Sequence, residues 1–325
     1  MVDILNLKPI KISRDLKGKY ILIYGAPKTG KTTLASQFPK NLLLAFEPGY
    51  NGLDNIMVQP ITKWSEFKSV LKQLDKPEAK EMYNTITIDT ADIAWDYCEK
   101  YICSSNMNET TGEIPKALGD IPWGKGYDLC KKEFDESLRR IAMMGYGLVI
   151  ISHEQMKNMK TESGQEYQKI MPTLADRPKL IVNRLVDIIA YLRLSNDDGK
   201  RYIYTRGNER FEAGSRFAKL EPKFEMSYEN LVEELYKAID AQAGGKADET
   251  TTSNFFSQGR KFEDVIAEAK EVFTKLMEQN KEENAVLTNN ILLKTFGKPT
   301  KLSETTPDQQ ELVEVVLDEW KALLK

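Results

Sequence analysis

The sequence predicts an α/β fold with a mainly parallel β-sheet flanked by helices, followed by a small helical appendage at the carboxyl end. Up to about residue 225, short apolar runs alternate with helical patterns, which is typical of a sheet whose strands are joined by helical crossovers. A glycine-containing turn separates the first apolar run from the first helical pattern, and beyond residue 260 the patterns are helical only. Together these observations predict one α/β core and a second, helical unit.

Each expected strand is a short apolar run, and each expected helix has apolar residues at helical spacing. In one helix, for example, Phe134, Leu138 and Ile141 are spaced to lie on a single face. The strands are expected at residues 20–24, 42–46, 85–89, 147–152, 185–193 and 201–206. The helices are expected to begin near Lys31 and to cover residues 65–74, 91–102, 128–144 and 228–241.

Two long polar segments interrupt this alternation, at residues 104–127 and 154–178. Both exceed the usual length of a connection inside a compact domain, where long loops are mostly functional or disordered. Because each follows an element that ends near the expected nucleotide side of the sheet, we expect both to be functional loops.

Composition shifts divide the chain into three expected parts. Residues 1–242 form the core, and a small, polar, glycine-containing stretch at 243–260 forms a linker. Residues 261–325 form a helical domain of three helices, with breaks near Glu282 and between Gly297 and Pro307.

The overall composition is that of a globular protein without a membrane segment. Charged residues make up 29% of the chain and the formal net charge is -3, so any contact with nucleic acid must come from local patches. No apolar run reaches membrane-spanning length, and the amino-terminal residues lack the apolar centre of a signal peptide. The three cysteines have no metal-like spacing, so we expect a cytoplasmic protein with free thiols.

The stretch GAPKTGKT follows the first expected strand and fits the pattern G-x-x-x-x-G-K-[ST]. In such a loop, backbone N–H groups wrap a phosphate, and glycine permits the close approach. Lys31 is expected to reach the β- and γ-phosphates and to assist catalysis, and Thr32 is expected to bind Mg²⁺. With ATP as the default nucleotide, the expected binding residues are Gly25, Ala26, Pro27, Lys28, Thr29, Gly30, Lys31, Thr32 and Thr33.

Two carboxylates follow expected strands at the edge where this loop lies. Asp89 ends the run TITID, where P-loop enzymes place the acid that supports the metal ion. Its alternative role is to cap the next helix, a task that Asp92 would share. Glu47 follows the run LLLAF and is expected to activate the attacking water, the alternative being a surface glutamate before a proline turn.

His153, the only histidine, follows the strand GLVIIS. A polar side chain at this position can form a hydrogen bond with the γ-phosphate. When that phosphate is lost, the change in bonding can act on the segment that begins one residue later. The alternative is a structural histidine without such a role. Arg206, Arg210 and Arg216 lie at or beyond the end of the last expected strand, and Arg216 or Arg210 is expected to enter a neighbouring subunit's site and stabilise the transferring phosphoryl group.

The order of these parts resembles the RecA-like recombinase core of the P-loop NTPases. It is most similar to the compact phage-encoded ATP-binding proteins of that superfamily, which promote single-strand annealing or strand exchange. The resemblance covers about residues 17–220: Glu47, Asp89 and His153 stand where the family has its glutamate, its acid and its polar sensor. It implies that residues 104–127 and 154–178 are DNA-binding loops, with ALGDIPWGKGYDL similar to the run of the first loop into a helix.

The chain departs from the family pattern in two places. His153 replaces the glutamine of the bacterial recombinase, and the short amino-terminal part lacks the polymerising segment. The second segment also balances its basic residues with acidic ones, so DNA binding would depend on stacking surfaces and on several subunits acting together. Those surfaces are Met156, Tyr167 and Met171, with Trp123 and Tyr127 in the first segment; the alternative is a lid over the nucleotide.

The expected function is that of a Mg²⁺-dependent ATPase in the bacterial host cytoplasm. It would assemble with itself as a ring or filament on single-stranded DNA and promote phage homologous recombination. A single-strand-binding or replication protein is a further candidate partner, through the carboxyl-terminal domain. The alternative is an ATP-gated loader or adaptor for such a protein, with docking by the helical appendage and by Phe255 and Phe256. A small-molecule kinase is a third option, for which no acceptor pocket is apparent.

Overall fold

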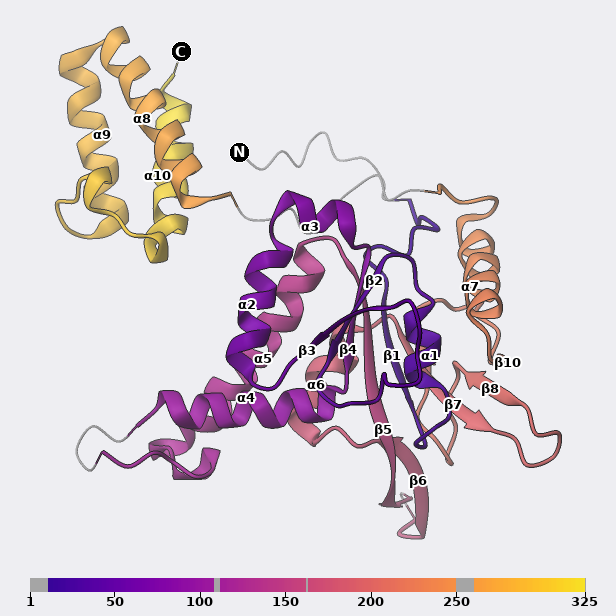
Figure 1. Cartoon of the computed structure of the whole chain (residues 1–325). Helices are drawn as coiled ribbons and strands as arrows, with labels where there is room; N and C mark the ends of the chain where they lie inside the picture. Colours follow the sequence, from indigo (N-terminus) through magenta and orange to yellow (C-terminus); the bar gives the residue numbers. More distant parts are fainter. Residues whose placement is uncertain (1–10, 108–111, 162, 250–259, 325) are drawn as a thin grey trace. The chain divides into compact units, whose positions relative to one another are not determined.

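The computed structural model describes residues 11–107, 112–161, 163–249 and 260–324 (Figure 1). These residues belong to two compact units, which are described separately below. The larger unit holds the described residues 11–249, and the smaller unit holds residues 260–324.

The larger unit is built on a ten-stranded sheet with the order β10-β8-β7-β1-β5-β4-β2-β3, in which β6 also pairs with β5 and β9 with β7. The six strands β1, β2, β3, β4, β5 and β7 run parallel, whereas β6, β8, β9 and β10 add antiparallel pairs. The strands are β1 (Tyr20–Gly25), β2 (Asn41–Ala45), β3 (Met57–Pro60), β4 (Thr85–Asp89), β5 (Gly147–Lys160), β6 (Glu166–Pro172), β7 (Ile188–Leu194), β8 (Arg201–Tyr204), β9 (Gly214–Ser215) and β10 (Lys223–Glu225).

Helices cover both faces of this sheet (Figure 1). One buried cluster joins the sheet to helices α2, α4, α5 and α6, and a second joins it to α1 and α7. The helices are α1 (Lys31–Ser36), α2 (Trp64–Leu74), α3 (Pro77–Met82), α4 (Ala91–Ser105), α5 (Lys125–Met143), α6 (Asp176–Leu185) and α7 (Tyr228–Ala243). The expected fold class, a mainly parallel sheet flanked by helices with further helices at the carboxyl end, is confirmed.

The second polar segment is a β-hairpin and not a loop. Strand β5 continues past the sheet to Lys160 and pairs with β6, and the hairpin projects beyond the neighbouring strands (Figure 1). The expected strand at 147–152 was therefore too short, and α6 begins inside the expected loop at Asp176. Most side chains of the outer hairpin are exposed, so the sequence lacks the apolar alternation that marks a half-buried strand.

Other expected boundaries also need correction. Residues 185–187 belong to the end of α6 and to a turn, and β7 begins at Ile188. The first polar segment contains two short 3₁₀ turns, η1 (Leu118–Asp120) and η2 (Pro122–Gly124), and α5 begins within it at Lys125. The elements α3, β3, β9 and β10 are short and were not predicted from the sequence.

The chain just after α7 bonds to that helix and to the first described residues, since the Asp248 oxygen accepts from the Arg14 backbone N–H at 2.8 Å. Arg14 Nε donates to Asp240 Oδ1 at 3.0 Å, and the Ala247 backbone N–H donates to the same oxygen at 3.0 Å. Phe255 and Phe256, suggested as docking residues, lie outside the described residues. None of the helices in the described ranges is long and apolar enough to cross a membrane.

The smaller unit consists of three packed helices, α8 (Phe262–Gln279), α9 (Lys281–Phe296) and α10 (Gln310–Leu323). Asn280 caps α9 by accepting from the Glu283 backbone N–H, and Gly297 ends it in the left-handed conformation, with φ at 67°. Its core contains Val265, Leu276, Leu292, Leu317 and Trp320. The two helix breaks fall where the sequence predicts them.

Candidate functional site

The loop between β1 and α1 lies at the carboxyl edge of the parallel sheet. It ends at Gly30, the residue before α1, which has φ at 93°, a left-handed conformation that suits glycine. Gly25 lies against β7, because a Cβ atom placed on it would be 2.4 Å from the Leu192 backbone oxygen. Both glycines of the motif are therefore required by backbone geometry.

We expect Gly25→Ala to lower the free energy of unfolding by about 1–3 kcal/mol, because the added methyl group overlaps the backbone of β7. Denaturant unfolding of the purified protein measures this difference. Gly245→Ala is the matched control, since no atom lies within 4 Å of a Cβ placed there. Equal stabilities of the two variants would contradict the close packing of β1 against β7.

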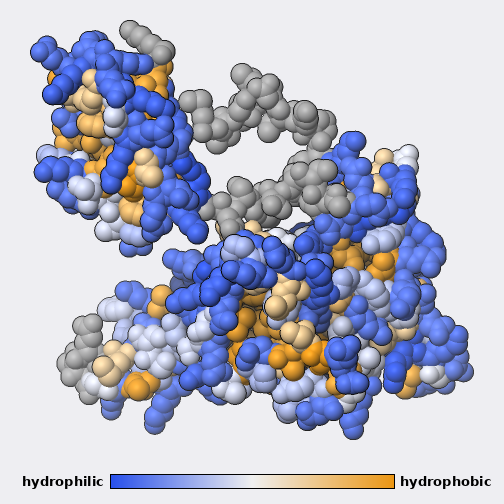
Figure 2. Space-filling model, turned by 45° about the horizontal axis from the view of Figure 1, so that its top comes forward, coloured by the Kyte–Doolittle hydropathy of each residue, from blue (hydrophilic) through white to orange (hydrophobic). Residues whose placement is uncertain are grey.

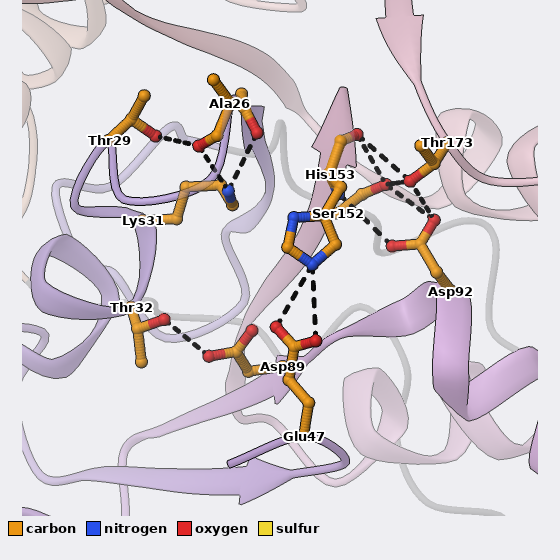
Figure 3. Close-up of polar contacts among 11 residues, drawn as sticks. Ala26, Thr29, Lys31, Thr32, Glu47, Asp89, Asp92, Ser152, His153 and Thr173 are labelled. Carbon is orange, nitrogen blue, oxygen red and sulfur yellow. Dashed lines mark hydrogen bonds and ion pairs between the residues drawn. The ribbon is translucent and has the colours of Figure 1, made fainter. Parts of the chain in front are cut away.

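The ammonium group of Lys31 is held against the loop (Figure 3). Its Nζ atom donates to the backbone oxygens of Gly25 and Ala26, each at 2.9 Å, and the residue is only 6% exposed. Thr29 Oγ1 also donates to the Ala26 oxygen, at 2.8 Å. Burial lowers the pKa of Lys31, although the nearby carboxylates of Asp89 and Glu47 oppose this shift.

Asp89 ends β4 beside the start of α1. Its Oδ2 atom accepts from Thr32 Oγ1 at 2.7 Å, while Oδ1 is buried without a hydrogen-bond partner (Figure 3). The side chain is 2% exposed, and this burial raises the pKa of Asp89 to about 6. A buried carboxylate oxygen without a partner is costly unless a ligand completes its bonding.

The residues present fit Mg²⁺. The free Oδ1 of Asp89 and the hydroxyl of Thr32 are hard oxygen donors at the mouth of a phosphate-binding loop. Magnesium in nucleotide sites is usually held by one or two such side chains together with phosphate oxygens and water. Asp89 and Thr32 are therefore the residues that would hold the metal ion.

Glu47 and His153 face each other next to this pair (Figure 3). His153 Nε2 lies 3.3 Å from Glu47 Oε1 and 3.4 Å from Oε2. Glu47 follows β2 and His153 lies within β5, so two different strands bring the groups together. A Cβ atom placed on Gly49 would lie 3.9 Å from oxygens of Glu47, Asp89 and Thr32 alike, which shows how closely the three side chains converge.

The charged and hydroxyl groups of the site border one pocket of about 460 Å³, a size typical of small-molecule sites; they are Lys31, Thr32, Glu47, Asp89 and His153. It brings together Glu47, Asp89 and His153, which the sequence placed at the ends of three strands. From the loop it includes Pro27, Lys28, Gly30, Lys31, Thr32 and Thr33, while Gly25, Ala26 and Thr29 are not among its lining residues. The pocket is completed by four residues that no sequence pattern predicted: Gly49, Gly52, Leu53 and Arg201.

A hydrogen-bond network joins the pocket to the base of the hairpin (Figure 3). Asp92, in the first turn of α4, accepts from Ser152 Oγ at 3.1 Å and from Thr173 Oγ1 at 2.6 Å, both at its Oδ1 atom. The Thr173 backbone N–H donates to the His153 oxygen at 2.9 Å. Asp92, considered from the sequence only as a helix cap, thus ties α4 to the residues on either side of the hairpin, Ser152 before it and Thr173 after it.

Residues 17–217 match the model of a protein family described as the AAA domain, and this match covers more than half of the chain. The chain belongs to the AAA domain family. An AAA domain is a P-loop NTPase domain, which agrees with the loop and pocket described above.

Two further proteins are similar to this AAA-domain chain. The SPbeta prophage-derived uncharacterized protein YorG of Bacillus subtilis (strain 168) is 29% identical over 338 residues, which cover 99% of each chain. The chain in the crystal structure of the RadB recombinase is 15% identical in sequence to this chain, with a TM-score of 0.35. The similarity covers 60% of this chain and 83% of that one.

The two arginines proposed to act on a neighbour lie away from the pocket of their own AAA domain. Arg216 donates to Asp187 Oδ1 at 2.9 Å and to the Arg184 oxygen at 2.6 Å, beside the first residues of β1 and β7 and so at the opposite edge of the sheet. Arg210 is exposed, and its backbone oxygen accepts from Ile170 of the hairpin at 2.8 Å. The arginine that does border the pocket is Arg201.

Proposed function

We propose that the protein is a Mg²⁺-dependent ATPase that binds single-stranded DNA and serves phage homologous recombination, by strand annealing or exchange. The observation that carries this proposal is the connection of the Glu47–His153 pair, inside the P-loop pocket, to the base of an exposed hairpin. The match along almost the whole chain to a prophage-derived protein supports the phage setting.

In this proposal the loop binds the phosphates of ATP, and Lys31 exchanges its two backbone partners for the β- and γ-phosphates. Thr32 and Asp89 hold Mg²⁺, which neutralises phosphate charge when bound. Glu47 accepts a proton from the attacking water, because its carboxylate lies at the mouth of the same pocket and is held by His153.

His153 would report the γ-phosphate to the hairpin. Its ring contacts Glu47, while its backbone oxygen accepts from Thr173, the residue that follows β6. A change in the ring's bonding after hydrolysis would therefore act on both hairpin strands through the Asp92 network. ATP hydrolysis and hairpin position become linked.

The hairpin offers a surface suited to a DNA strand. Residues directly opposite in an antiparallel pair share a face, and on one face Lys157 lies opposite Lys169 and Met159 opposite Tyr167. Two ammonium groups beside an aromatic ring and a thioether match the needs of a phosphate backbone and its bases, although Lys157 Nζ must exchange its ion pair with Asp176, at 2.9 Å, for a phosphate.

The first polar segment adds two aromatic groups, of which Tyr127 contacts the helix that follows the hairpin. Arg177, in the helix that follows the hairpin, has its guanidinium carbon 4.1 Å from the centre of the Tyr127 ring. Trp123 is 92% exposed, and its backbone has the left-handed φ of 64°, which is uncommon for a bulky residue. We propose these rings as base-stacking surfaces.

The test is ATP turnover and strand binding with and without a single-stranded oligonucleotide. We expect the strand to stimulate turnover, and Lys157→Ala with Lys169→Ala to reduce the slope of log affinity against log salt by about two. Lys72→Ala with Lys76→Ala, two exposed lysines at the end of α2 and the start of α3, is the control pair. Absence of stimulation and of binding at low salt would remove the DNA function.

Self-assembly as a ring or filament remains part of the proposal, with Arg210 or Arg216 reaching the site of the next subunit. Both arginines are exposed, but the guanidinium of Arg216 is engaged by Asp187, which favours Arg210. Electron microscopy with a slowly hydrolysed ATP analogue, with and without the oligonucleotide, tests assembly.

The exposed apolar residues of the smaller unit favour a second candidate, an ATP-gated loader or adaptor for a replication or single-strand-binding protein. Val286, Leu293 and Val315 are 61%, 47% and 48% exposed, and Figure 2 shows hydrophobic residues on the surface of this unit. Pull-down from host lysate after nuclease treatment separates the candidates, because a loader keeps its protein partner without nucleic acid.

A further inference from the structure

The groups proposed to act on the γ-phosphate all lie to one side of β1. Asp89 ends β4, Glu47 follows β2 and His153 lies in β5, and these three strands follow β1 in one direction along the sheet. On the other side of β1 come β7 and then β8 (Figure 1). A nucleotide whose terminal phosphate faces Glu47 and Asp89 would therefore extend its nucleoside toward β7 and β8.

Arg201 begins β8 at the edge of the sheet where the loop lies. The register pairs Leu192 with Ile203 and Leu194 with Arg201, so Arg201 lies on the same face as Ile203, two residues away. Ile203 and Leu192 belong to the buried cluster that packs against α1 and α7. Arg201 is thus on the α1 face, and it borders the P-loop pocket.

Met226 lies between Arg201 and the loop. Its backbone N–H donates to the Arg201 oxygen at 2.8 Å, and its methyl carbon is 2.9 Å from where a Cβ atom on Gly30 would be. No ion pair of Arg201 occurs within the described parts of the chain. A planar guanidinium without an ion-pair partner and a polarisable thioether therefore flank the loop on the side away from Glu47.

We propose that Arg201 and Met226 form the nucleoside subsite of the ATP pocket, with the guanidinium plane stacked on the nucleobase. Guanidinium groups stack on flat rings, and methionine packs against aromatic edges. This inference rests on the proposed ATPase function and adds to it the residues that recognise the base, as distinct from the phosphates.

The experiment compares Arg201→Ala with the wild type for binding of ATP, ADP and inorganic tripolyphosphate, each with Mg²⁺, by calorimetry. We expect affinity for ATP and ADP to fall about tenfold, and affinity for tripolyphosphate, which has no base, to change less than about twofold. Arg201→Lys keeps the positive charge but lacks the planar guanidinium group, so it should bind the three ligands as Arg201→Ala does. Arg206→Ala, an exposed arginine beyond the other end of β8, should bind as the wild type does.

Equal losses for ATP and tripolyphosphate, or full rescue by Arg201→Lys, would overturn the proposal, since the contact would then be with phosphates. Unchanged ATP binding by Arg201→Ala would overturn it as well. Lys31→Ala distinguishes this inference from the proposed ATPase function, because it should weaken the binding of all three ligands. If the wild-type protein bound none of them, the ATPase proposal itself would fall.

Discussion

Replacing Glu47 by glutamine should lower ATP turnover by about 10²–10⁴-fold while ATP still binds. The glutamine side chain keeps the shape of Glu47 and can still bond His153, 3.3 Å away, but it cannot take a proton from water. Steady-state turnover and nucleotide affinity, measured on the same preparation, separate the loss of proton transfer from a loss of binding.

Glu81→Gln is the control for this change, because Glu81 is an exposed glutamate in α3 and does not border the pocket. Its turnover should match that of the wild type. Near-normal turnover by Glu47→Gln would mean that another group activates the water, and His153 would then be the next residue to replace.

Replacing Asp89 by asparagine should abolish Mg²⁺-dependent turnover and also stabilise the nucleotide-free protein. Burial raises the pKa of Asp89 from 3.8 to about 6, so the folded protein holds this proton more tightly than the unfolded chain does. The free energy of unfolding therefore falls as pH rises between these two values, and the full cost of the buried charge is present above pH 6. At pH 8 the variant should be more stable by up to about 3 kcal/mol.

Denaturant unfolding at pH 4 and pH 8, with and without Mg²⁺ and ATP, measures both effects. The difference between Asp89→Asn and wild type should be small at pH 4 and large at pH 8, and added Mg²⁺ and ATP should stabilise the wild type more. Asp197→Asn, at an exposed position between β7 and β8, is the control. A variant no more stable than wild type at pH 8 and still responsive to Mg²⁺ would contradict the burial and metal-binding roles of Asp89.

Much of the fold and of the pocket followed from local patterns. The strand at 85–89 has the expected bounds, and β1 differs by one residue at its end. Because the carboxyl ends of parallel strands meet at one edge, residues after separate apolar runs could be expected to converge. Glu47, Asp89 and His153 do line one pocket with the loop, although their catalytic roles remain predictions.

The rest depends on contacts that no local pattern contains. The hairpin has few buried residues and therefore no periodic apolar signal. Thr173 bonds Asp92 across a separation of 81 residues. Arg201 reaches the pocket only because β8 pairs with β7, and β7 with β1, an order that the sequence does not display. Arg210 and Arg216 were chosen from the sequence by their position along the chain. That position does not show at which edge of the sheet a residue lies.

His153 gives this protein a built-in spectroscopic label. Since the chain has a single histidine, its imidazole ring protons give one isolated set of resonances in a magnetic resonance spectrum, without isotopic enrichment or an attached dye. That ring contacts the carboxylate of Glu47, and His153 directly precedes Glu154, the first paired residue of the projecting hairpin. Adding nucleotide and oligonucleotide in separate titrations, and following this one signal, would show whether both ligands change the environment of the His153 ring.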